Sequence, residues 1–106
     1  MLWRVELAPS TLSELKAIEA YYQERDSAEY AQSLIEKLFA RFDSLAQLPH
    51  RGTRPRLQEL RHYLQVLEKP YRILYRIDEE NRVVFIVAIL HQTQDLLSAW
   101  RSQKRS

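Results

Sequence analysis

Hydrophobic and polar residues alternate between Tyr71 and Asp78, and this period of two predicts a half-buried β-strand. One face of the strand would carry Tyr71, Ile73, Tyr75 and Ile77. The other face would carry Arg72, Leu74, Arg76 and Asp78. The polar run Asp78–Asn81 then has the composition of a turn.

The next segment, Val83–Leu90, is apolar on both faces and rich in β-branched residues. A strand of this kind needs cover on both sides, so we expect it inside a sheet rather than at its edge. Polar residues follow at once, from His91 to Asp95. A rigid strand that delivers a polar cluster to the surface is a candidate position for function.

Two helices are predicted before this hairpin. In the first, which runs to about Arg25, Thr11 and Glu14 have the spacing of a capping box. Ser27 would cap the second helix, which Pro49 ends. Its apolar stripe has helical spacing and consists of Ala31, Leu34, Ile35, Leu38, Phe42 and Leu45. The short connection predicts an antiparallel helical hairpin, in which burial of Leu38 or Phe42 contributes about 1.5–3 kcal/mol each.

The remaining segments complete the predicted fold. Leu2–Leu7 and Leu60–Glu68 alternate like strands, Pro49–Glu59 reads as a loop, and Thr93 or Asp95 would cap a short C-terminal helix. The element order is therefore β-α-α-β-β-β-α in a single α+β domain over residues 1–106. We expect a mostly antiparallel four-stranded sheet, packed by the helical hairpin, with strand order 2-3-4-1.

Charge is distributed unevenly along the chain. The net charge of the 106 residues is only +2, but residues 49–76 carry seven basic and two acidic side chains, a balance of +5. Three of the basic residues, Arg51, Arg54 and Arg56, lie in the predicted loop. This balance favours an anionic partner, either nucleic acid or an acidic protein segment, although a solvated basic face would have the same composition.

Residue types exclude several chemistries. The chain has no cysteine, which removes disulfides and thiolate chemistry and fits a reducing cytoplasm. The three histidines lack ligand spacing, and one glycine cannot form a glycine-rich phosphate loop, so we expect no metal and no cofactor. No apolar run approaches a membrane span or a signal peptide.

The chain also carries residue types suited to metal-free RNA cleavage. His91 has a side chain suited to acid–base catalysis, and Arg72 and Arg76, with Arg61 on the neighbouring strand, could hold a phosphate. The alternative is that His91 only ends a strand with a hydrogen bond and that the arginines are solvated.

Several segments resemble the RelE/ParE superfamily of bacterial toxin–antitoxin toxins. The likeness is carried by the element order, by LQELRHYLQVLEKP, and by YRILYRIDEENRVVFIVAILHQTQD. The end of the second segment, VAILHQTQDLL, is most similar to the ParE branch. The resemblance implies an α+β toxin fold. It also implies one of two activities: poisoning of DNA gyrase, as in ParE-type toxins, or ribosome-dependent mRNA cleavage, as in RelE-type toxins.

The RelE pattern is incomplete in this chain. Arg72 matches its strand arginine, but Thr93 and Ala99 stand where that pattern has a second arginine and a tyrosine. Trp100 is adjacent and could stack on a base. The ParE reading is therefore favoured, with Arg72, Arg76, His91, Trp100 and Arg101 as the candidate residues for binding the target or nucleic acid.

The resemblance also implies a ParD-like antitoxin whose disordered segment folds on the toxin in a hetero-oligomer. An acidic amphipathic segment would find charge complementarity and apolar surface on this chain. The residues predicted to bind it are Arg51, Arg54, Arg56, Leu38 and Phe42. A third hypothesis is a toxin fold retained only as a module that binds an antitoxin or dimerises.

Overall fold

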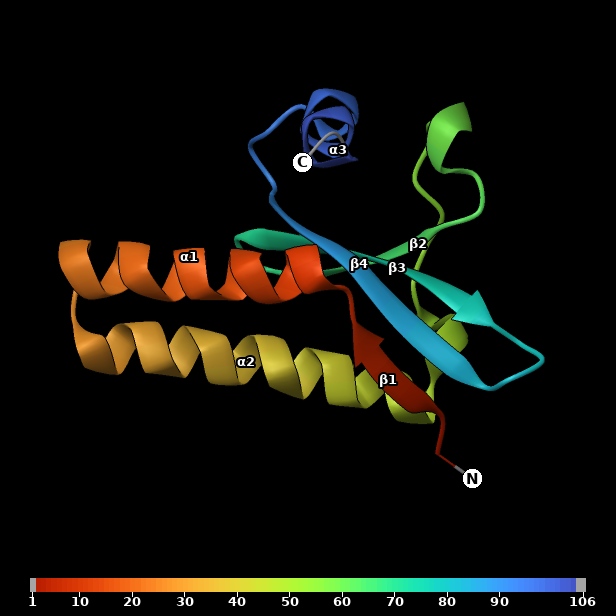
Figure 1. The fold of residues 1–106 in the computed structure, drawn as a ribbon, viewed down its shortest axis with the longest axis horizontal. Coiled ribbons are helices and arrows are strands. Elements are labelled where there is room, and N and C mark those ends of the chain that lie inside the picture. Colours follow the sequence, from red (N-terminus) through yellow and green to blue (C-terminus); the bar gives the residue numbers. More distant parts are fainter. Residues whose placement is uncertain (1, 105–106) are drawn as a thin grey trace.

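The computed structural model describes residues 2–104, which fold as a four-stranded sheet with three α-helices (Figure 1). In chain order the elements are β1 (Arg4–Leu7), α1 (Pro9–Arg25), α2 (Ala28–Gln47), the 3₁₀ turns η1 (Pro49–Arg51) and η2 (Gln58–Leu60), β2 (Leu64–Glu68), β3 (Tyr71–Asp78), β4 (Val83–His91) and α3 (Leu96–Lys104). The predicted α+β order of β-α-α-β-β-β-α is confirmed.

The sheet has the order β1-β4-β3-β2, so the predicted arrangement 2-3-4-1 is confirmed. β1 runs parallel to β4, and the other two pairs are antiparallel. β4 lies between β1 and β3, as its apolar composition on both faces predicts. Two short connections join β2, β3 and β4, and the Asp78 carboxylate accepts hydrogen bonds from both nitrogens of Asn81 in the second of them.

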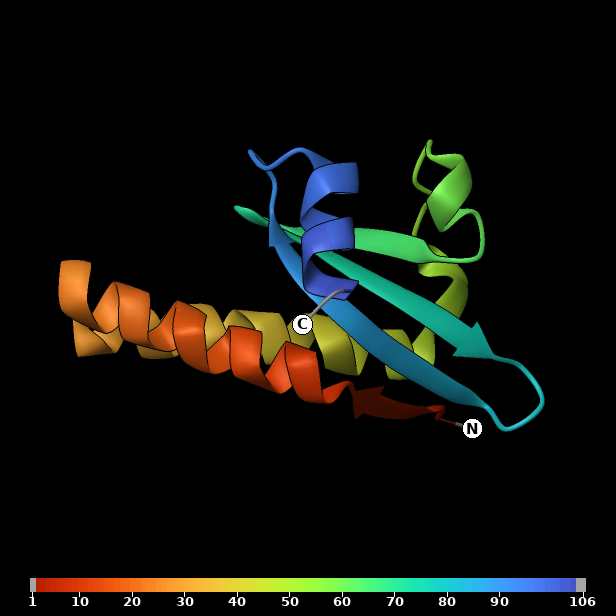
Figure 2. The ribbon, with the colours of Figure 1, turned by 45° about the horizontal axis from the view of Figure 1, so that its top comes forward.

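The α1–α2 hairpin covers one face of the sheet (Figure 2). The hydroxyl of Ser27 accepts a hydrogen bond from the backbone N–H of Tyr30, which confirms the predicted cap of α2. The helical stripe of α2 packs against the predicted apolar face of β3, and this cluster includes Leu34, Leu38, Phe42, Leu45, Tyr71, Ile73 and Tyr75. The main core therefore lies between the hairpin and the sheet.

α3 and η2 cover the opposite face of the sheet (Figure 1). A second, smaller cluster forms there from Leu60, Leu74, Ala88, Leu90 and Trp100. The carboxylate of Asp95 accepts a hydrogen bond from Ser98 N–H at 3.1 Å and caps α3, one of the two caps predicted. Both faces of the central strands are consequently buried.

A β-bulge in β4 changes which side chains face which layer. Leu74 pairs with Ala88 while Tyr75 pairs with Ile86, so Val87 is an extra residue on β4. Val87 and Ala88 both contribute to the cluster under α3, whereas Ile86 and Ile89 both belong to the core under the hairpin. Strict alternation does not continue through the bulge, and His91 turns to the hairpin face of the sheet.

Residues 60–63 do not extend β2, so the predicted strand Leu60–Glu68 is wrong in its first half. Leu60 ends η2, and the backbone N–H of Tyr63 donates to its carbonyl at 3.0 Å. This turn brings Leu60 to 0% exposure beneath α3. The free energy gained by burying that side chain outweighs the preference of the alternating sequence for a β-strand. The predicted loop Pro49–Glu59 likewise contains η1 and begins η2.

The predicted capping box of Thr11 and Glu14 is also wrong. α1 begins at Pro9, and both side chains hydrogen-bond to β4 instead: Thr11 Oγ1 donates to Ile86 O at 3.1 Å, and Glu14 Oε1 accepts from Ile89 N–H at 3.1 Å. β1 ends at Leu7 and its pairing with β4 ends at Ile86. Beyond Ile86 no strand pairs with this edge of β4 among the described residues, and side chains of α1 hydrogen-bond to its backbone groups instead.

Candidate functional site

His91 ends β4 and lies against Tyr71, with ring centroids 5.4 Å apart. Its Nδ1 accepts the backbone N–H of Thr93 at 3.2 Å and lies 2.7 Å from the Thr93 hydroxyl oxygen. Because Nδ1 accepts a hydrogen bond, the neutral ring carries its proton on Nε2. The strand end therefore holds the imidazole in one orientation and one tautomer.

Arg72 lies on the other face of the sheet from His91. Arg72 pairs with Leu90 in the ladder, and Leu90 belongs to the cluster under α3, while Tyr71, the ladder partner of His91, belongs to the hairpin core. Arg72 Nη1 donates to Gln65 Oε1 at 2.6 Å. The sheet itself separates the arginine and the histidine that the ribonuclease hypothesis requires together.

The other candidate arginines do not join His91 either. Arg61 Nη1 donates to the Gln58 carbonyl at 3.1 Å, within its own turn. The guanidinium of Arg76 lies over the ring of Phe85 at 4.2 Å. No three-residue nuclease site made of Arg61, Arg72 and His91 is assembled.

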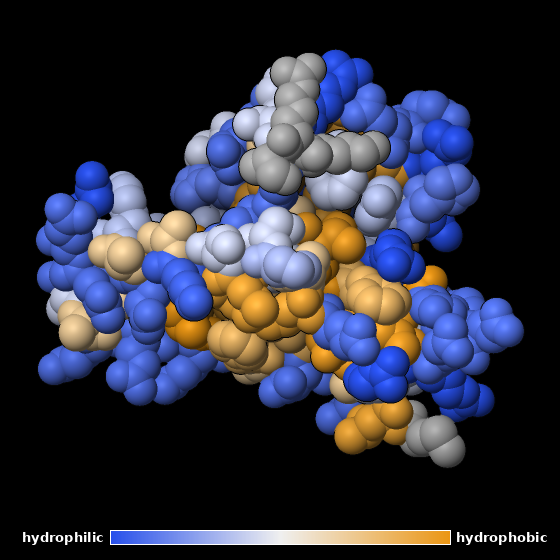
Figure 3. All heavy atoms as spheres, in the orientation of Figure 1, coloured by the Kyte–Doolittle hydropathy of each residue, from blue (hydrophilic) through white to orange (hydrophobic). Residues whose placement is uncertain are grey.

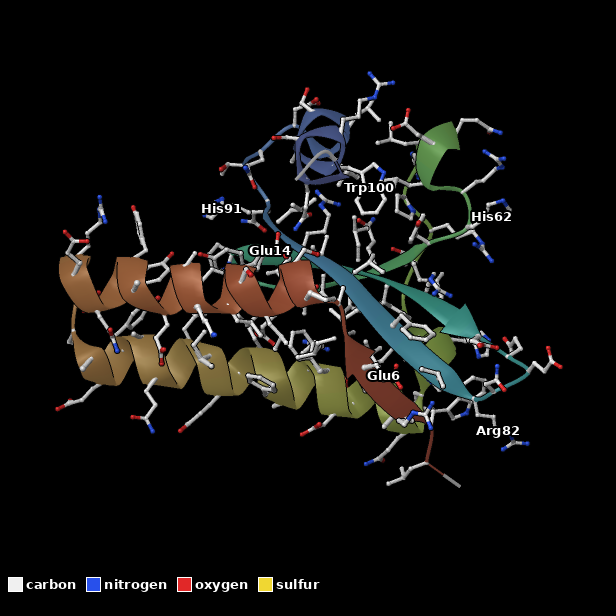
Figure 4. All side chains as sticks on the ribbon, in the orientation of Figure 1. Glu6, Glu14, His62, Arg82, His91 and Trp100 are labelled. Atoms are coloured by element: carbon white, nitrogen blue, oxygen red, sulfur yellow. The ribbon has the colours of Figure 1, made fainter. Side chains whose placement is uncertain are left out.

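The predicted role of Trp100 in stacking on a base does not agree with its position. The indole is 7% exposed and packs against Tyr63, with ring centroids 5.1 Å apart (labelled in Figure 4). Its neighbour Arg101 forms an ion pair with Glu59, in which Nη2 lies 2.8 Å from Oε1. Trp100 therefore holds α3 on the sheet, and its ring is covered.

Leu38 and Phe42, predicted to contact an antitoxin, are 0% and 2% exposed. Both lie in the core between α2 and the sheet. A partner cannot reach them on the folded surface, so this part of the prediction is corrected. The amphipathic pattern identified the buried face of α2 and could not distinguish it from a docking face.

A groove, here called the α1 groove, runs along α1 beside the open edge of β4 and α3. It consists of three adjoining hollows of about 640, 460 and 290 Å³. Ala17 lines all three hollows. The lining runs from Pro9 to Tyr22 on α1, includes Ile89 and His91 on β4, and ends on α3 at Gln103. Sequence reasoning missed this groove because its walls are far apart in the chain.

Glu14 and His91 line the same hollow of the α1 groove, and Figure 4 labels both side chains near α1. The carboxyl group of Glu14 hydrogen-bonds to Ile89 N–H on β4 and to the side-chain amide of Gln103 on α3. Burial raises the pKa of Glu14 to about 7, although both hydrogen bonds act in the opposite direction. One carboxyl group thus joins three elements and titrates near neutral pH.

Six arginines line two further hollows on the β2 side of the molecule. Arg41, Arg51 and Arg72 line one of about 400 Å³, and Arg54, Arg56 and Arg61 line one of about 330 Å³. We call these six residues the arginine surface. The sequence indicated its charge, but the side chains of Arg41 and Arg72 reach it only because α2 and β3 pack beside β2.

Tyr75 fixes the chain that carries this surface. Its buried hydroxyl donates to the Pro49 carbonyl at 2.7 Å and accepts from Gly52 N–H at 3.0 Å. A Cβ at Gly52 would lie 2.5 Å from the Tyr75 oxygen and 2.7 Å from the Gln65 carbonyl oxygen, so glycine is required there. Burial raises the pKa of Tyr75, which keeps this hydroxyl protonated as a donor.

Within residues 2–104, no group of three acidic or histidine side chains is arranged to hold a metal ion, and Figure 4 shows His62 well away from His91. None of the helices described is long and apolar enough to cross a membrane.

Comparison with known proteins gives one family and several similar structures. Residues 5–96 match the family model described as the ParE toxin of the type II toxin–antitoxin system parDE. A chromosomal ParDE system from P. aeruginosa is 16% identical with a TM-score of 0.72, and the match covers 85% of this chain and 96% of that one. The RelBE2 toxin–antitoxin complex from Mycobacterium tuberculosis is 23% identical with a TM-score of 0.59, covering 86% and 99%.

A mutant of the E. coli toxin RelE in the free state is 14% identical with a TM-score of 0.64, and the match covers 98% of each chain. At these identities the likeness to the solved structures shows a shared fold. A search of curated proteins gave no match.

Proposed function

Because this chain belongs to the ParE toxin family of type II toxin–antitoxin systems, we propose that it arrests growth by binding DNA gyrase and that a ParD-like antitoxin neutralises it. The toxin would act as a gyrase poison, a protein that blocks replication by trapping cleaved DNA complexes. Such a protein needs binding surfaces and no catalytic residues of its own.

The observation that carries this proposal is the separation of Arg72 from His91 by the sheet. A metal-free ribonuclease needs an acid–base group and a phosphate-stabilising cation at one reacting group. Here the cation and the imidazole belong to different faces, and Trp100 is buried where a base-stacking ring would be needed. This arrangement favours action by binding over RNA cleavage.

Purified toxin, gyrase and plasmid DNA test the proposal directly. We expect loss of supercoiling and accumulation of linear, gyrase-linked DNA at micromolar toxin. The variants His91→Ala and Arg72→Ala should not lose toxicity to the same extent, because the two residues lie on different faces of the sheet. Equal loss of toxicity in both variants, with mRNA cut on ribosomes and gyrase unaffected, would instead establish a ribosome-dependent endoribonuclease.

The antitoxin site that we propose is the α1 groove. Its lining runs along α1 for more than three helical turns, about 20 Å, which suits an amphipathic helix. Of the large apolar side chains exposed on the described hairpin, Tyr21 lines this groove, whereas Leu12, Tyr30 and Phe39 line none of its three hollows. Figure 3 shows hydrophobic side chains gathered on the hairpin near β1. A partner helix in the α1 groove would cover Ala17, Tyr21 and Ile89 without unfolding the core.

Ala17→Arg tests the α1 groove because Ala17 is exposed and lines all three hollows. We expect it to weaken binding of the protein encoded beside this gene by at least tenfold in calorimetry. Ala20→Arg is the matched control, since Ala20 is exposed on the same helix and lines none of these hollows. Equal affinities for the two variants would place the antitoxin elsewhere.

A further inference from the structure

The arginine surface keeps most of its positive charge. Among the described residues, only Arg41 of the six forms an ion pair, with Glu68 at 3.3 Å. Three of the others donate to neutral oxygens: Arg54 to the Arg61 carbonyl at 2.8 Å, Arg61 to the Gln58 carbonyl at 3.1 Å, and Arg72 to the Gln65 amide at 2.6 Å. These hydrogen bonds orient the guanidinium groups without neutralising them.

Several arginines line each of the two hollows. Arg54, Arg56 and Arg61 line one hollow of about 330 Å³, and Arg51 and Arg72 line the other, of about 400 Å³. Thr53, in the lining of the second hollow, directly precedes Arg54 in the chain. Repulsion between fixed cations is relieved when an anion binds between them. Guanidinium groups also match the geometry of phosphate oxygens, which can accept two parallel N–H bonds.

The surroundings favour a polyanion over an amphipathic protein segment. Of the large hydrophobic side chains that are exposed among the described residues, only Leu67 lines either hollow. Figure 3 shows hydrophilic side chains over the end of the molecule that carries η2. An amphipathic helix would find little apolar surface to cover here, whereas a sugar–phosphate backbone needs charge and hydrogen-bond donors and no apolar surface.

We propose that the arginine surface binds the phosphate backbone of double-stranded DNA. The choice of duplex DNA rests on the proposed function, because a gyrase-bound toxin lies beside the DNA that gyrase holds. The antitoxin and the DNA would then use different surfaces, the α1 groove and the arginine surface. This assignment replaces the predicted role of Arg51, Arg54 and Arg56 in binding the antitoxin.

Fluorescence anisotropy with a labelled 20-base-pair duplex tests the proposal, with affinity measured at several salt concentrations. The triple variant Arg54→Gln, Arg56→Gln, Arg61→Gln should reduce the slope of log K against log salt by about 2–3, because each phosphate contact contributes about 0.9. Affinity at 0.1 M salt should fall at least tenfold.

The control triple variant Lys16→Gln, Arg25→Gln, Lys37→Gln removes the same charge from exposed positions on the hairpin. We expect it to change affinity less than twofold and to leave the slope unchanged. Arg56→Gln alone is a second test in case the triple variant misfolds, since Arg56 is exposed and its side chain makes no hydrogen bond with any other described residue. It should lower the slope by about 1.

Equal losses in the two triple variants would overturn the proposal, because net charge alone would then explain binding. It would also be overturned if the wild-type protein bound no duplex at 50 mM salt, or if single-stranded RNA or polyglutamate bound more tightly than duplex DNA. A supercoiling assay run in parallel separates the two proposals. DNA binding without gyrase inhibition contradicts only the proposed function, and inhibition without DNA binding contradicts only this inference.

Discussion

Replacing Glu14 by glutamine should stabilise the protein at neutral and alkaline pH. The pKa of Glu14 is about 7 in the folded protein, against an ordinary value of 4.5, because burial disfavours the charged form. Between these two pH values the unfolded chain loses its proton before the folded protein does. The wild-type protein therefore loses stability as pH rises from about 4.5 to about 7, and below that interval both states are protonated.

The magnitude follows from the same two values. Each pH unit between them corresponds to about 1.36 kcal/mol, so the whole interval gives at most about 3.4 kcal/mol. The carboxyl group is partly exposed in the α1 groove, and solvent screening reduces this to about 1–2 kcal/mol. Glutamine has the same shape, can accept from Ile89 N–H and does not ionise. Glu14→Gln should therefore be more stable than wild type by about 1–2 kcal/mol at pH 8.

Urea unfolding of both proteins at pH values from 4.5 to 8.5 measures this difference. We expect the two free energies of unfolding to coincide at the acidic end and to diverge as pH rises. Glu24→Gln serves as the control, because the Glu24 side chain is 79% exposed. The reasoning is refuted if Glu14→Gln is the less stable protein at pH 8, or if its pH dependence matches that of wild type.

Three further substitutions test the packing around these surfaces. Tyr75→Phe removes a buried hydroxyl that joins Pro49 and Gly52, so stability should fall by about 1–3 kcal/mol in urea unfolding, and an unchanged midpoint would contradict this. Gly52→Ala should lower the melting temperature and weaken duplex binding, because its Cβ would lie 2.5 Å from the Tyr75 oxygen; unchanged values of both would show that the loop can move. Thr11→Val keeps the buried shape but leaves Ile86 O without the hydroxyl donor, and should cost about 1 kcal/mol; a more stable variant would contradict that role.

Two features of the candidate sites depended on long-range contacts. Glu14 has the spacing of a cap, yet its hydrogen bonds reach Ile89 and Gln103, 75 and 89 positions away. The RelE resemblance assigns Trp100 to base stacking because it follows Ala99, which stands at the tyrosine position of that pattern, yet Tyr63 and the cluster under α3 cover its ring. Sequence reasoning assigned both residues from their neighbours in the chain, where no signal of the distant partner exists.

The sequence by itself determined the elements and their order. The period of two in β3, the stripe of α2, the Ser27 cap and the apolar composition of β4 each act over a few residues, so each could be predicted. Only the tertiary structure decided on which face of the sheet each candidate side chain lies. One extra residue at Val87 turns His91 away from the face of Arg72, since a single-residue shift reverses every later side chain of a strand.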